Sequence, residues 1–480
     1  MNTRHPETRE DLASRLFARA CGTDARKASS IDILLDSAEN FPAWEEALSA
    51  ARCHICIEMY IIADDDFGRR IRQILLDKLQ QGVEVILVYD WLGSLSARLR
   101  GFFQPLAEAG ARVYAYNPPT WTSIVGLESR NHRKSLIIDG ETAFVSGLCI
   151  SAAWQGDPAR GISAWRDTGL RLRGEVVGGV WAAFADTLKL LGGVMPDGGG
   201  SPAPCGQSKA RVSAATPGGT GTLRLDLNLI GMARRNLWLT DAYFIPTGLY
   251  VRALAAAARD GVDVRILVPR TSDIKWIGTV SRTQYRSLLE AGVRVFEWNG
   301  TMLHAKSAVA DGLWARVGST NLNPSSWYLN RELDILIEDE AAACRMEQIF
   351  LQDLAFSTEL VLDERARIRL LRQREKHRFG RRGGRMMGMV RQAAQLGHIF
   401  DAEPRLVAPS EAWAYLSIGT AVLLLAALLW FVPQLVLWPL YFFLAAGGAG
   451  MAARALRQLA RLNKKPPARQ DGGGRGGGKG

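Results

Sequence analysis

Two short histidine–lysine motifs are the part of this sequence best suited to chemistry. Each histidine is followed two residues later by a lysine, and four residues separate that lysine from an aspartate that precedes a glycine. An imidazole can attack an electrophile or transfer a proton, and an ammonium group can bind a phosphate oxygen. Two such units predict one site that holds a phosphodiester from both sides. The six motif residues are His132, Lys134 and Asp139 in the first copy and His304, Lys306 and Asp311 in the second.

The spacing within each motif predicts its geometry. Residues two apart in a strand point to the same face, so we expect His132 and Lys134 to point the same way, as do His304 and Lys306. Each Asp-Gly pair predicts a hairpin turn into the next strand, which Asp139 and Asp311 would brace rather than react themselves. One histidine could attack phosphorus while the other protonates the leaving oxygen, which would give a covalent phosphohistidine.

Alternating apolar strands and helical segments surround both motifs. In the first half we expect strands at 53–62, 83–89 and 111–116 and helices at 68–79 and 95–109, the second broken near Pro105. In the second half we expect strands at 236–240, 262–268 and 293–298 and helices at 249–259 and 281–291. This rhythm predicts an α/β fold with a mixed, largely parallel sheet in each half.

The whole lobe is duplicated, not the motif alone. The run Gly82-Val83-Glu84-Val85 resembles Gly261-Val262-Asp263-Val264, and both lead into apolar strands. We expect the two lobes to pack as a pseudo-dimer. The expected segments are a polar N-terminal stretch (1–30), lobe 1 (31–193), a Gly/Pro/Ser-rich linker (194–208), lobe 2 (209–360), a basic segment (361–411), a membrane hairpin (412–453) and a basic Gly-rich tail (454–480).

Charge and hydropathy indicate where the protein works. The net charge of +11 favours an anionic partner, which could be nucleic acid or an acidic membrane. Cationic residues crowd the range 365–391, and no charged residue occurs from 412 to 453. That uncharged run is about twice the roughly 20 residues of one spanning helix, and Pro433-Gln434 interrupts it. It predicts a hairpin with both basic flanks in the cytosol, with a re-entrant insertion as the alternative.

The cysteines and the N-terminus limit other possibilities. Six cysteines in 480 residues do not make a disulfide framework. The pair Cys53 and Cys56 has zinc-like spacing but no second pair to complete a site, so we expect packed thiols and neither a metal nor a cofactor. Residues 1–20 carry no apolar core, so we expect no cleavable signal peptide.

The chain resembles the phospholipase D superfamily, and within it the bacterial cardiolipin synthases, over about 31–338. The phrases that carry the resemblance are Ile57-Glu58-Met59-Tyr60, Tyr89-Asp90-Trp91-Leu92-Gly93-Ser94, Asn131-His132-Arg133-Lys134, Trp165-Arg166-Asp167-Thr168, Tyr243-Phe244-Ile245-Pro246, Leu303-His304-Ala305-Lys306, Gly318-Ser319-Thr320-Asn321 and Asn330-Arg331-Glu332.

The resemblance implies a role for each matching residue. His132 would be the nucleophile and His304 the general acid, with Lys134 and Lys306 on the phosphate oxygens. Asp167 would orient His132, and Glu332 would orient His304. The phosphate pocket would be completed by Ser319, Asn321 and Asn330. One departure stands out, because Cys149 occupies a position where the family usually has an asparagine, and a thiol is a poor substitute for an amide donor.

The resulting expectation is a membrane-bound cardiolipin synthase. It would move a phosphatidyl group from one phosphatidylglycerol to another, at an anionic bilayer surface, with the lobes on the cytoplasmic side of a bacterial inner membrane and no nucleic-acid partner. Three alternatives stay open: another transphosphatidylase or phospholipid hydrolase with a different donor such as phosphatidylethanolamine, a nuclease-type phosphodiesterase, and a non-catalytic lipid-binding scaffold suggested by Cys149.

Overall fold

A computed structural model describes residues 8–119, 129–200, 202–274, 276–363 and 368–370. The strands of the first half are β1 (Arg26–Leu35), β2 (His54–Met59), β3 (Glu84–Asp90), β4 (Arg112–Tyr116), β5 (Ser135–Ile138), β6 (Thr142–Ser146) and β7 (Thr168–Gly174). Its helices are α2 (Asp36–Ala50), α3 (Asp66–Gln80), α4 (Leu95–Leu99), α5 (Gln104–Glu108) and α6 (Val176–Leu190).

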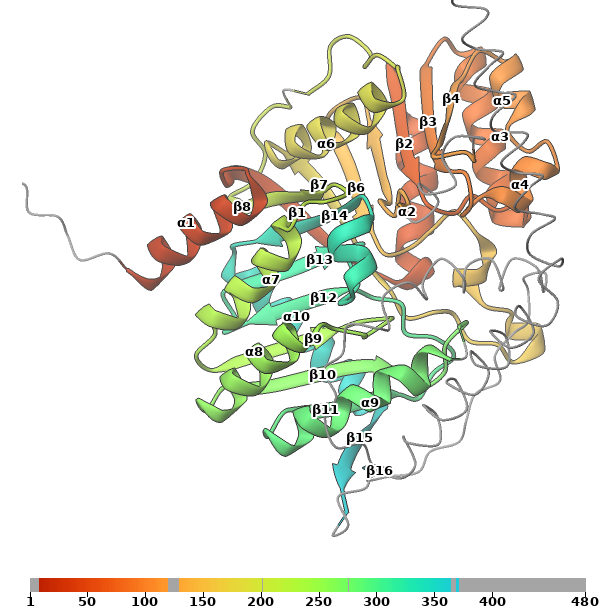
Figure 1. Ribbon diagram of the computed structural model, residues 1–480. Coiled ribbons are helices and arrows are strands. Elements are labelled where there is room, and N and C mark those ends of the chain that lie inside the picture. The colour runs from red at the N-terminus through yellow and green to blue at the C-terminus, as the bar shows by residue number, and fades with distance from the viewer. Residues whose placement is uncertain (1–7, 120–128, 201, 275, 364–367, 371–480) are drawn as a thin grey trace, which may run out of the picture. The chain divides into compact units, whose positions relative to one another are not determined.

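The second half repeats this plan and adds two strands. Its strands are β8 (Ser208–Ala215), β9 (Asn236–Thr240), β10 (Asp263–Pro269), β11 (Arg294–Trp298), β12 (Ser307–Ala310), β13 (Trp314–Gly318), β14 (Glu332–Ile337), β15 (Ser357–Leu362) and β16 (Ile368–Leu370). Its helices are α7 (Gly221–Met232), α8 (Gly248–Arg259), α9 (Ile277–Glu290) and α10 (Glu340–Ala355), and the N-terminal helix α1 (Arg9–Cys21) packs beside α7 (Figure 1).

The described strands form one continuous sheet whose order is duplicated. The order is β16-β15-β11-β10-β9-β12-β13-β14-β8-β1-β7-β6-β5-β2-β3-β4. Outward from the antiparallel β1–β8 pair, β7, β6, β5, β2, β3 and β4 on one side correspond to β14, β13, β12, β9, β10 and β11 on the other. The duplication seen in the sequence is therefore a duplication of topology.

The expectation of largely parallel sheets is wrong. Only β2–β3, β3–β4, β9–β10 and β10–β11 are parallel among the described pairs, and the other pairs are antiparallel. The parallel pairs are those joined by crossover helices, as in a βαβ unit. Antiparallel pairs arise from the hairpin after each motif and from the strands where the two halves meet. The strands at this junction also join the two expected sheets into one.

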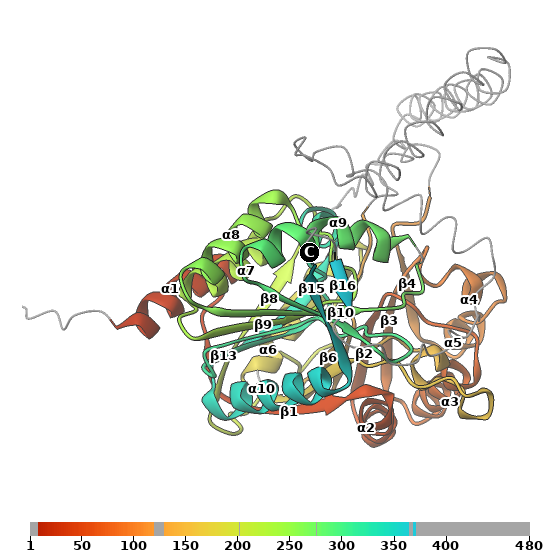
Figure 2. The same cartoon turned by 90° about the horizontal axis from the view of Figure 1, so that it is seen from below.

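Three apolar cores hold the sheet and its helices. Helices α1, α7, α8 and α9 cover one face of the second half, and α2, α3, α4 and α5 cover one face of the first. A third core lies under α6 and α10 and takes side chains from strands of both halves. Figure 2 shows α7, α8 and α9 on one side of the second-half strands and α6 and α10 on the other.

The N-terminal stretch differs from its expected polar character. Its helix begins with a capping box, in which Thr8 and Asp11 each bind the backbone of the other, and it buries Ala13, Phe17 and Ala20 in the second-half core. Its exposed residues are mostly charged (Glu10, Asp11, Arg15 and Arg19), with Leu12 as an apolar exception, so the average composition of the stretch concealed an amphipathic helix.

The C-terminal expectations fall outside the described residues. These are most of the basic segment, the hydrophobic run at 412–453 and the Gly-rich tail. Among the helices in the described ranges, none is both long enough and apolar enough to cross a bilayer.

Candidate active site

Both histidine–lysine motifs lie immediately before a central strand. The ladders of β5 and β12 begin at Ser135 and Ser307, one residue after each lysine, so the motifs precede the strands that were expected to contain them. All four motif side chains are buried. The ammonium group of Lys134 donates to the carbonyl oxygen of His132 at 2.6 Å, and Lys306 donates to the carbonyl of His304. Each lysine is thus held beside its own histidine.

The backbone of each motif is bound to the other half of the chain. His132 donates its N–H to the carbonyl of Arg331 at 2.9 Å, and Arg331 donates to the carbonyl of Arg130 at 2.9 Å. The second motif repeats the pattern, because His304 donates to Arg166 at 2.7 Å and Arg166 donates back, to Met302, at 2.8 Å. These parallel bridges bring the segment before each acid alongside the opposite motif.

The acids therefore pair across the halves, and the expected pairing is wrong. Nδ1 of His132 lies 2.9 Å from a carboxylate oxygen of Glu332, and Nδ1 of His304 lies 2.8 Å from Asp167. The sequence argument assigned each acid to the motif that precedes it in the chain. The β1–β8 junction instead joins the two halves edge to edge in one sheet, and the bridges between the motif and acid segments bring each acid to the histidine of the other copy.

Neighbouring donors fix both carboxylates. Ser319 donates to Glu332 at 2.6 Å, and the Asn330 amide does so at 3.3 Å. The indole N–H of Trp154 donates to Asp167 at 2.9 Å. Ser319 and Asn330 were expected to contact phosphate, but their hydrogen bonds go to Glu332, so in the structure they orient a histidine through its acid.

Cys149 and Asn321 occupy equivalent positions in the two copies. The strand before each is placed alike, since Ser146 donates to the Lys134 carbonyl and Gly318 to the Lys306 carbonyl, both at 3.3 Å. Both side chains are buried, and within the described chain the amide oxygen of Asn321 has no hydrogen-bond partner. Burial raises the pKa of the Cys149 thiol, which the nearby Lys134 opposes. The first half therefore presents a neutral thiol where the second presents an amide.

Electrostatics leave both imidazoles neutral. Burial lowers the pKa of His132 to about 4, although Glu332 acts to raise it. Burial, assisted by Lys306, lowers the pKa of His304 to about 3. Burial would raise the pKa of Asp167 and Glu332, but the adjacent histidines and lysines outweigh it and the net pKa of both lies below its usual value. Ionised carboxylates thus accept Nδ1–H and leave the Nε2 lone pairs to react.

The two ammonium groups lie in a site that an anion would complete. Burial lowers the pKa of Lys306 to about 8 and also lowers that of Lys134. Each sits over an aromatic ring, with Lys134 5.1 Å from the centre of Tyr60 and Lys306 5.7 Å from that of Tyr243. The ionised Asp167 and Glu332 offset part of the cost of burying these cations, and a bound phosphate would stabilise both ammonium groups further.

Asp139 and Asp311 brace their turns as predicted, so although they belong to the two motifs they are not among the reacting groups. The Asp139 carboxylate accepts the N–H groups of residues 52–54, and Asp311 accepts those of residues 234–236. Each has a positive φ and is followed by a glycine with positive φ, as in a type I′ hairpin turn. Both residues therefore fasten the turn after the motif strand to the start of β2 or β9.

Several site residues were not singled out by sequence reasoning. Tyr60 contacts the His132 ring with centroids 4.9 Å apart, and Tyr243 contacts His304 at 5.8 Å. The buried Asp90 carboxylate accepts the N–H of Asn131, beside the nucleophile candidate, at 2.9 Å. Burial raises the pKa of Asp241 to about 7, and this carboxyl group binds the N–H groups of Leu322 and Tyr243. Each of these four residues ends a strand of a βαβ unit or follows one closely. Polar residues at such strand ends are the sequence signal that could have identified them as site residues.

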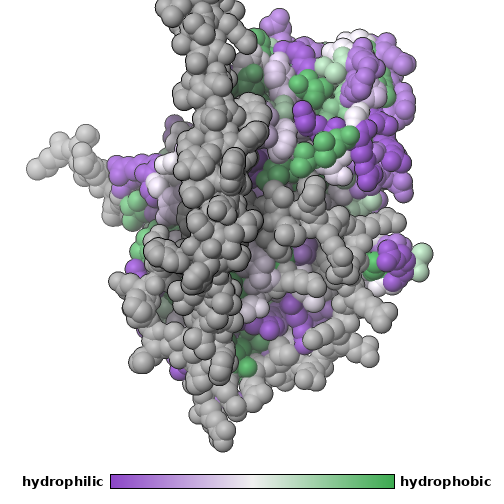
Figure 3. Space-filling view, turned by 45° about the vertical axis from the view of Figure 1, so that its right-hand side comes forward, coloured by the Kyte–Doolittle hydropathy of each residue, from purple (hydrophilic) through white to green (hydrophobic). Residues whose placement is uncertain are grey.

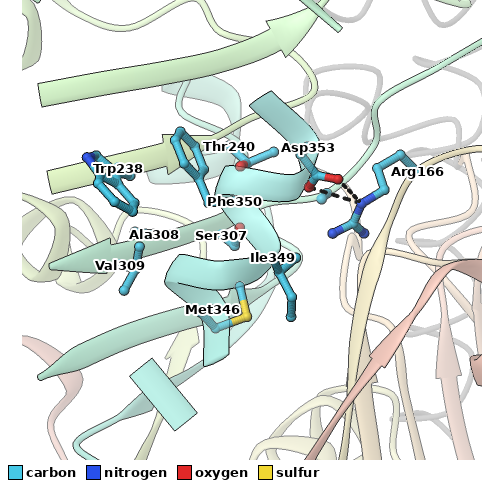
Figure 4. Close-up of a pocket in the computed structure, with 11 residues that line it drawn as sticks. Arg166, Trp238, Thr240, Ser307, Ala308, Val309, Met346, Ile349, Phe350 and Asp353 are labelled. Carbon is cyan, nitrogen blue, oxygen red and sulfur yellow. Dashed lines mark hydrogen bonds and ion pairs between the residues drawn. The ribbon is translucent and has the colours of Figure 1, made fainter. Parts of the chain in front are cut away.

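Two arginines secure the crossed arrangement. Arg166 donates from Nε to Asp353 of α10 at 2.8 Å, and Arg331 pairs with Asp186 and donates to Thr187 of α6. Figure 4 shows the Arg166–Asp353 pair beside a cavity of about 10 Å³, which lies between α10 and the strands β9 and β12. That volume suits about one water molecule. Each arginine therefore ties an acid-bearing segment to a helix of the other half.

A duplicated α/β fold with two histidine–lysine units converging on one site defines a phosphodiester enzyme of the phospholipase D type. Residues 45–153 and 227–354 match the family described as "Cardiolipin synthase, PLD-like domain". A cardiolipin synthase of Halalkalibacterium halodurans is 31% identical over 74% of this chain and 72% of its own length. Cardiolipin synthase 2 of Bacillus anthracis is 32% identical over 78% of this chain and 73% of its own. The chain belongs to the bacterial cardiolipin synthase family of the phospholipase D superfamily.

A solved structure supports the fold. The phosphatidylserine synthase of Haemophilus influenzae superposes with a TM-score of 0.59 at 16% identity, over 72% of this chain and 91% of that one. At this identity the likeness establishes the shared architecture alone.

Proposed function

We propose that this protein is a cardiolipin synthase that transfers a phosphatidyl group between two phosphatidylglycerol molecules and releases glycerol. The observation that carries the proposal is the convergence of two neutral imidazoles and two buried ammonium groups in one chain that belongs to the cardiolipin synthase family. An anionic phosphodiester fits between such groups because its two non-bridging oxygens, which share one negative charge, can accept hydrogen bonds from both ammonium groups.

In the first half-reaction, Nε2 of His132 attacks phosphorus. The bond from phosphorus to the glycerol oxygen breaks, and His304 gives that oxygen a proton. His304 is neutral in the free site, so it must gain this proton when the anionic substrate enters and raises its pKa. We assign His132 as the nucleophile because the ammonium group of Lys306 lies against the His304 ring, 3.0 Å from Nδ1 and 3.1 Å from Nε2, whereas no described residue forms a hydrogen bond with Nε2 of His132.

In the second half-reaction, a primary hydroxyl of another phosphatidylglycerol attacks the phosphohistidine. Its proton passes to His304, the phosphorus–nitrogen bond breaks, and cardiolipin leaves with His132 neutral again. Lys134, Lys306 and Asn321 would bind the phosphate oxygens in both steps. Glu332 and Asp167 would stabilise the imidazolium form of the histidine each contacts.

The two lobes, with proposed limits 31–193 and 209–360 and a linker at 194–208, would act as a pseudo-dimer around this site. The mirrored strand order and the crossed acids support that view. In it, each lobe supplies one histidine–lysine unit and the acid for the other.

We also propose that the protein works at the anionic inner membrane of a bacterium, with its lobes on the cytoplasmic side. The basic range 365–391 and the uncharged run 412–453 support this, since each cation beside an anionic bilayer contributes about 1 kcal/mol. In Figure 3 hydrophobic residues stand among hydrophilic ones on the upper part of the visible surface. One exposed hydrophobic residue is Leu99, 70% exposed between the exposed Arg98 and Arg100.

A product assay tests the activity. Purified protein in detergent micelles with labelled phosphatidylglycerol should yield cardiolipin and free glycerol in equal amounts. His132→Asn should abolish both, and rapid denaturation of the wild type at neutral to mildly alkaline pH should trap a phosphohistidine, which acid then hydrolyses. Phosphatidic acid as the only lipid product would instead make the protein a hydrolase.

A truncation tests the membrane proposal. Deleting residues 371–480 should release the protein from membranes, and a truncated protein that stays bound would overturn the membrane proposal.

A further inference from the structure

A small apolar cluster stands next to His304 and is partly open. Its buried members are Ala242, Tyr243, Ile274, Ile277 and Met302, and its partly exposed members are Trp165, Ile245 and Trp276. We call this set the His304 cluster. Its three partly exposed side chains come from separate connections, those after β6, β9 and β10, that meet at one place.

The corresponding place at His132 is built differently. Three aromatic residues, Trp154, Trp165 and Tyr243, contact the His304 ring with centroids 5.2 to 5.8 Å away, whereas in the described part of the chain the His132 ring contacts Tyr60. The connection after β10 runs over residues 270–276 and supplies Ile274 and Trp276, while the equivalent connection after β3 covers only residues 91–94. At Gly93 a side chain would overlap the Tyr60 carbonyl, so this shorter connection packs tightly. The two halves therefore differ in the connections beside their histidines, and the longer connection with its apolar residues lies beside His304.

In the proposed reaction, the two sides of the phosphorus atom bind different groups. With His132 as nucleophile, the departing glycerol and the incoming acceptor oxygen both occupy the side of phosphorus that faces His304. An apolar surface on that side gains little from contact with glycerol or water, which are polar. It can instead bind the glycerol backbone and first acyl carbons of a second lipid. Continuity with His304, through Trp165 and Tyr243, places the cluster where the acceptor would approach.

We propose that the His304 cluster binds the apolar part of the acceptor phospholipid and thereby selects lipid over water as acceptor. The inference rests on the proposed function and deepens it. In the selected step the acceptor hydroxyl oxygen bonds to phosphorus, the phosphorus–nitrogen bond of His132 breaks, and the hydroxyl proton passes to His304. Water entering by the same path would give phosphatidic acid.

The test separates the two half-reactions. Trp276→Ala and Ile245→Ala are assayed with labelled phosphatidylglycerol for glycerol release, cardiolipin and phosphatidic acid. We expect the first-turnover burst of glycerol to stay within about twofold of wild type and the ratio of cardiolipin to phosphatidic acid to fall about tenfold, since tenfold corresponds to 1.4 kcal/mol of lost acceptor binding. Trp276→Phe should retain most of the ratio. Leu190→Ser, an exposed apolar residue at the end of α6 outside the cluster, should leave it unchanged.

Two results would overturn the inference. One is an unchanged product ratio in Trp276→Ala and Ile245→Ala proteins whose unfolding midpoints match wild type. The other is a loss of the first-turnover glycerol burst as large as the loss of cardiolipin, which would assign the cluster to donor binding. A wild-type protein that releases no glycerol from phosphatidylglycerol would defeat the proposed function itself, and that outcome is visible before any variant is made.

Discussion

At the scale of single residues, the crossed acids decide how each imidazole is held. A carboxylate on Nδ1 selects one tautomer and orients the ring, so the identity of that carboxylate determines which substitution disturbs which histidine. In this chain Glu332 acts on His132, and Asp167 acts on His304. Ser319 and Trp154 in turn hold those carboxylates, which makes them positioning residues.

The crossed pairing predicts selective energetic coupling. In a double-mutant cycle, His132→Asn and Glu332→Gln should show a coupling energy of roughly 1–3 kcal/mol in the free energy of unfolding, because they share a buried hydrogen bond. The cycle of His132→Asn with Asp167→Asn should show a smaller coupling, since Asp167 bonds to the other histidine. Urea unfolding of the single and double variants measures both, and stronger coupling in the second cycle would contradict the crossed arrangement.

The buried histidines predict a loss of stability in mild acid. Their pKa values of about 4 and about 3 lie below the unfolded value of about 6.5, so between these limits the unfolded chain binds protons that the folded chain does not. The stabilisation is complete above pH 6.5 and is lost as pH falls toward the folded pKa values. Each histidine should lower the free energy of unfolding by about 2 kcal/mol between pH 7 and pH 5.

The measurement is the urea midpoint as a function of pH. The carboxyls of Asp167 and Glu332, whose pKa values are also lowered, add a further loss of the same sign at lower pH. A variant with His132→Asn and His304→Asn should show a shallower decline from pH 7 to pH 5. An equal decline in that variant would mean that other groups cause it.

At the scale of elements, short connections place the reactive groups. The type I′ turns at Asp139-Gly140 and Asp311-Gly312 fasten the strands after each motif, and α6 and α10 anchor the arginines that precede the acids. Arg133, fully buried, also donates to the carbonyls of Ala183 in α6 and Ala215 in β8. The site is thus supported by helices and strands rather than by free loops.

Gly147, directly after β6, is a position where an added methyl group would reach one of the acids that hold the histidines. A Cβ there would overlap the carboxylate of Asp167, which must then move away from His304. Gly147→Ala should lower kcat by roughly 10- to 100-fold, because small misplacements of catalytic groups are costly. Gly231→Ala, in the helix α7 with open space around its Cβ, is the matched control and should keep full activity and gain up to about 1 kcal/mol of stability. Steady-state kinetics compare the two, and full activity in Gly147→Ala would show that Asp167 tolerates displacement.

At the scale of the whole molecule, one chain contains both units of the site. The continuous sheet through β1 and β8 connects the halves, and the acid of each half serves the other. Neither half has a complete set of groups. The α1 helix, packed on the second half although it precedes the first, adds a further connection.

This arrangement predicts that two inactive variants will not complement each other. Full-length His132→Asn and full-length His304→Asn, mixed or co-expressed, should remain as inactive as either alone, because every site formed from one chain lacks one histidine. Cardiolipin formation from labelled phosphatidylglycerol is the readout. Recovered activity of about a quarter to a half of wild type would mean that chains exchange lobes in an oligomer.

The sequence alone determined what depends on local pattern. The two motifs, the duplication and most strand and helix positions follow from residue spacing, and β9 coincides with the expected 236–240. Tertiary structure decided what depends on contacts between distant residues. His132 and Glu332 are 200 positions apart, and nothing in the spacing of either motif says which acid lies against which ring. That choice follows from the β1–β8 junction, as does the antiparallel majority of the sheet, because strand register and packing are fixed only when the whole core assembles.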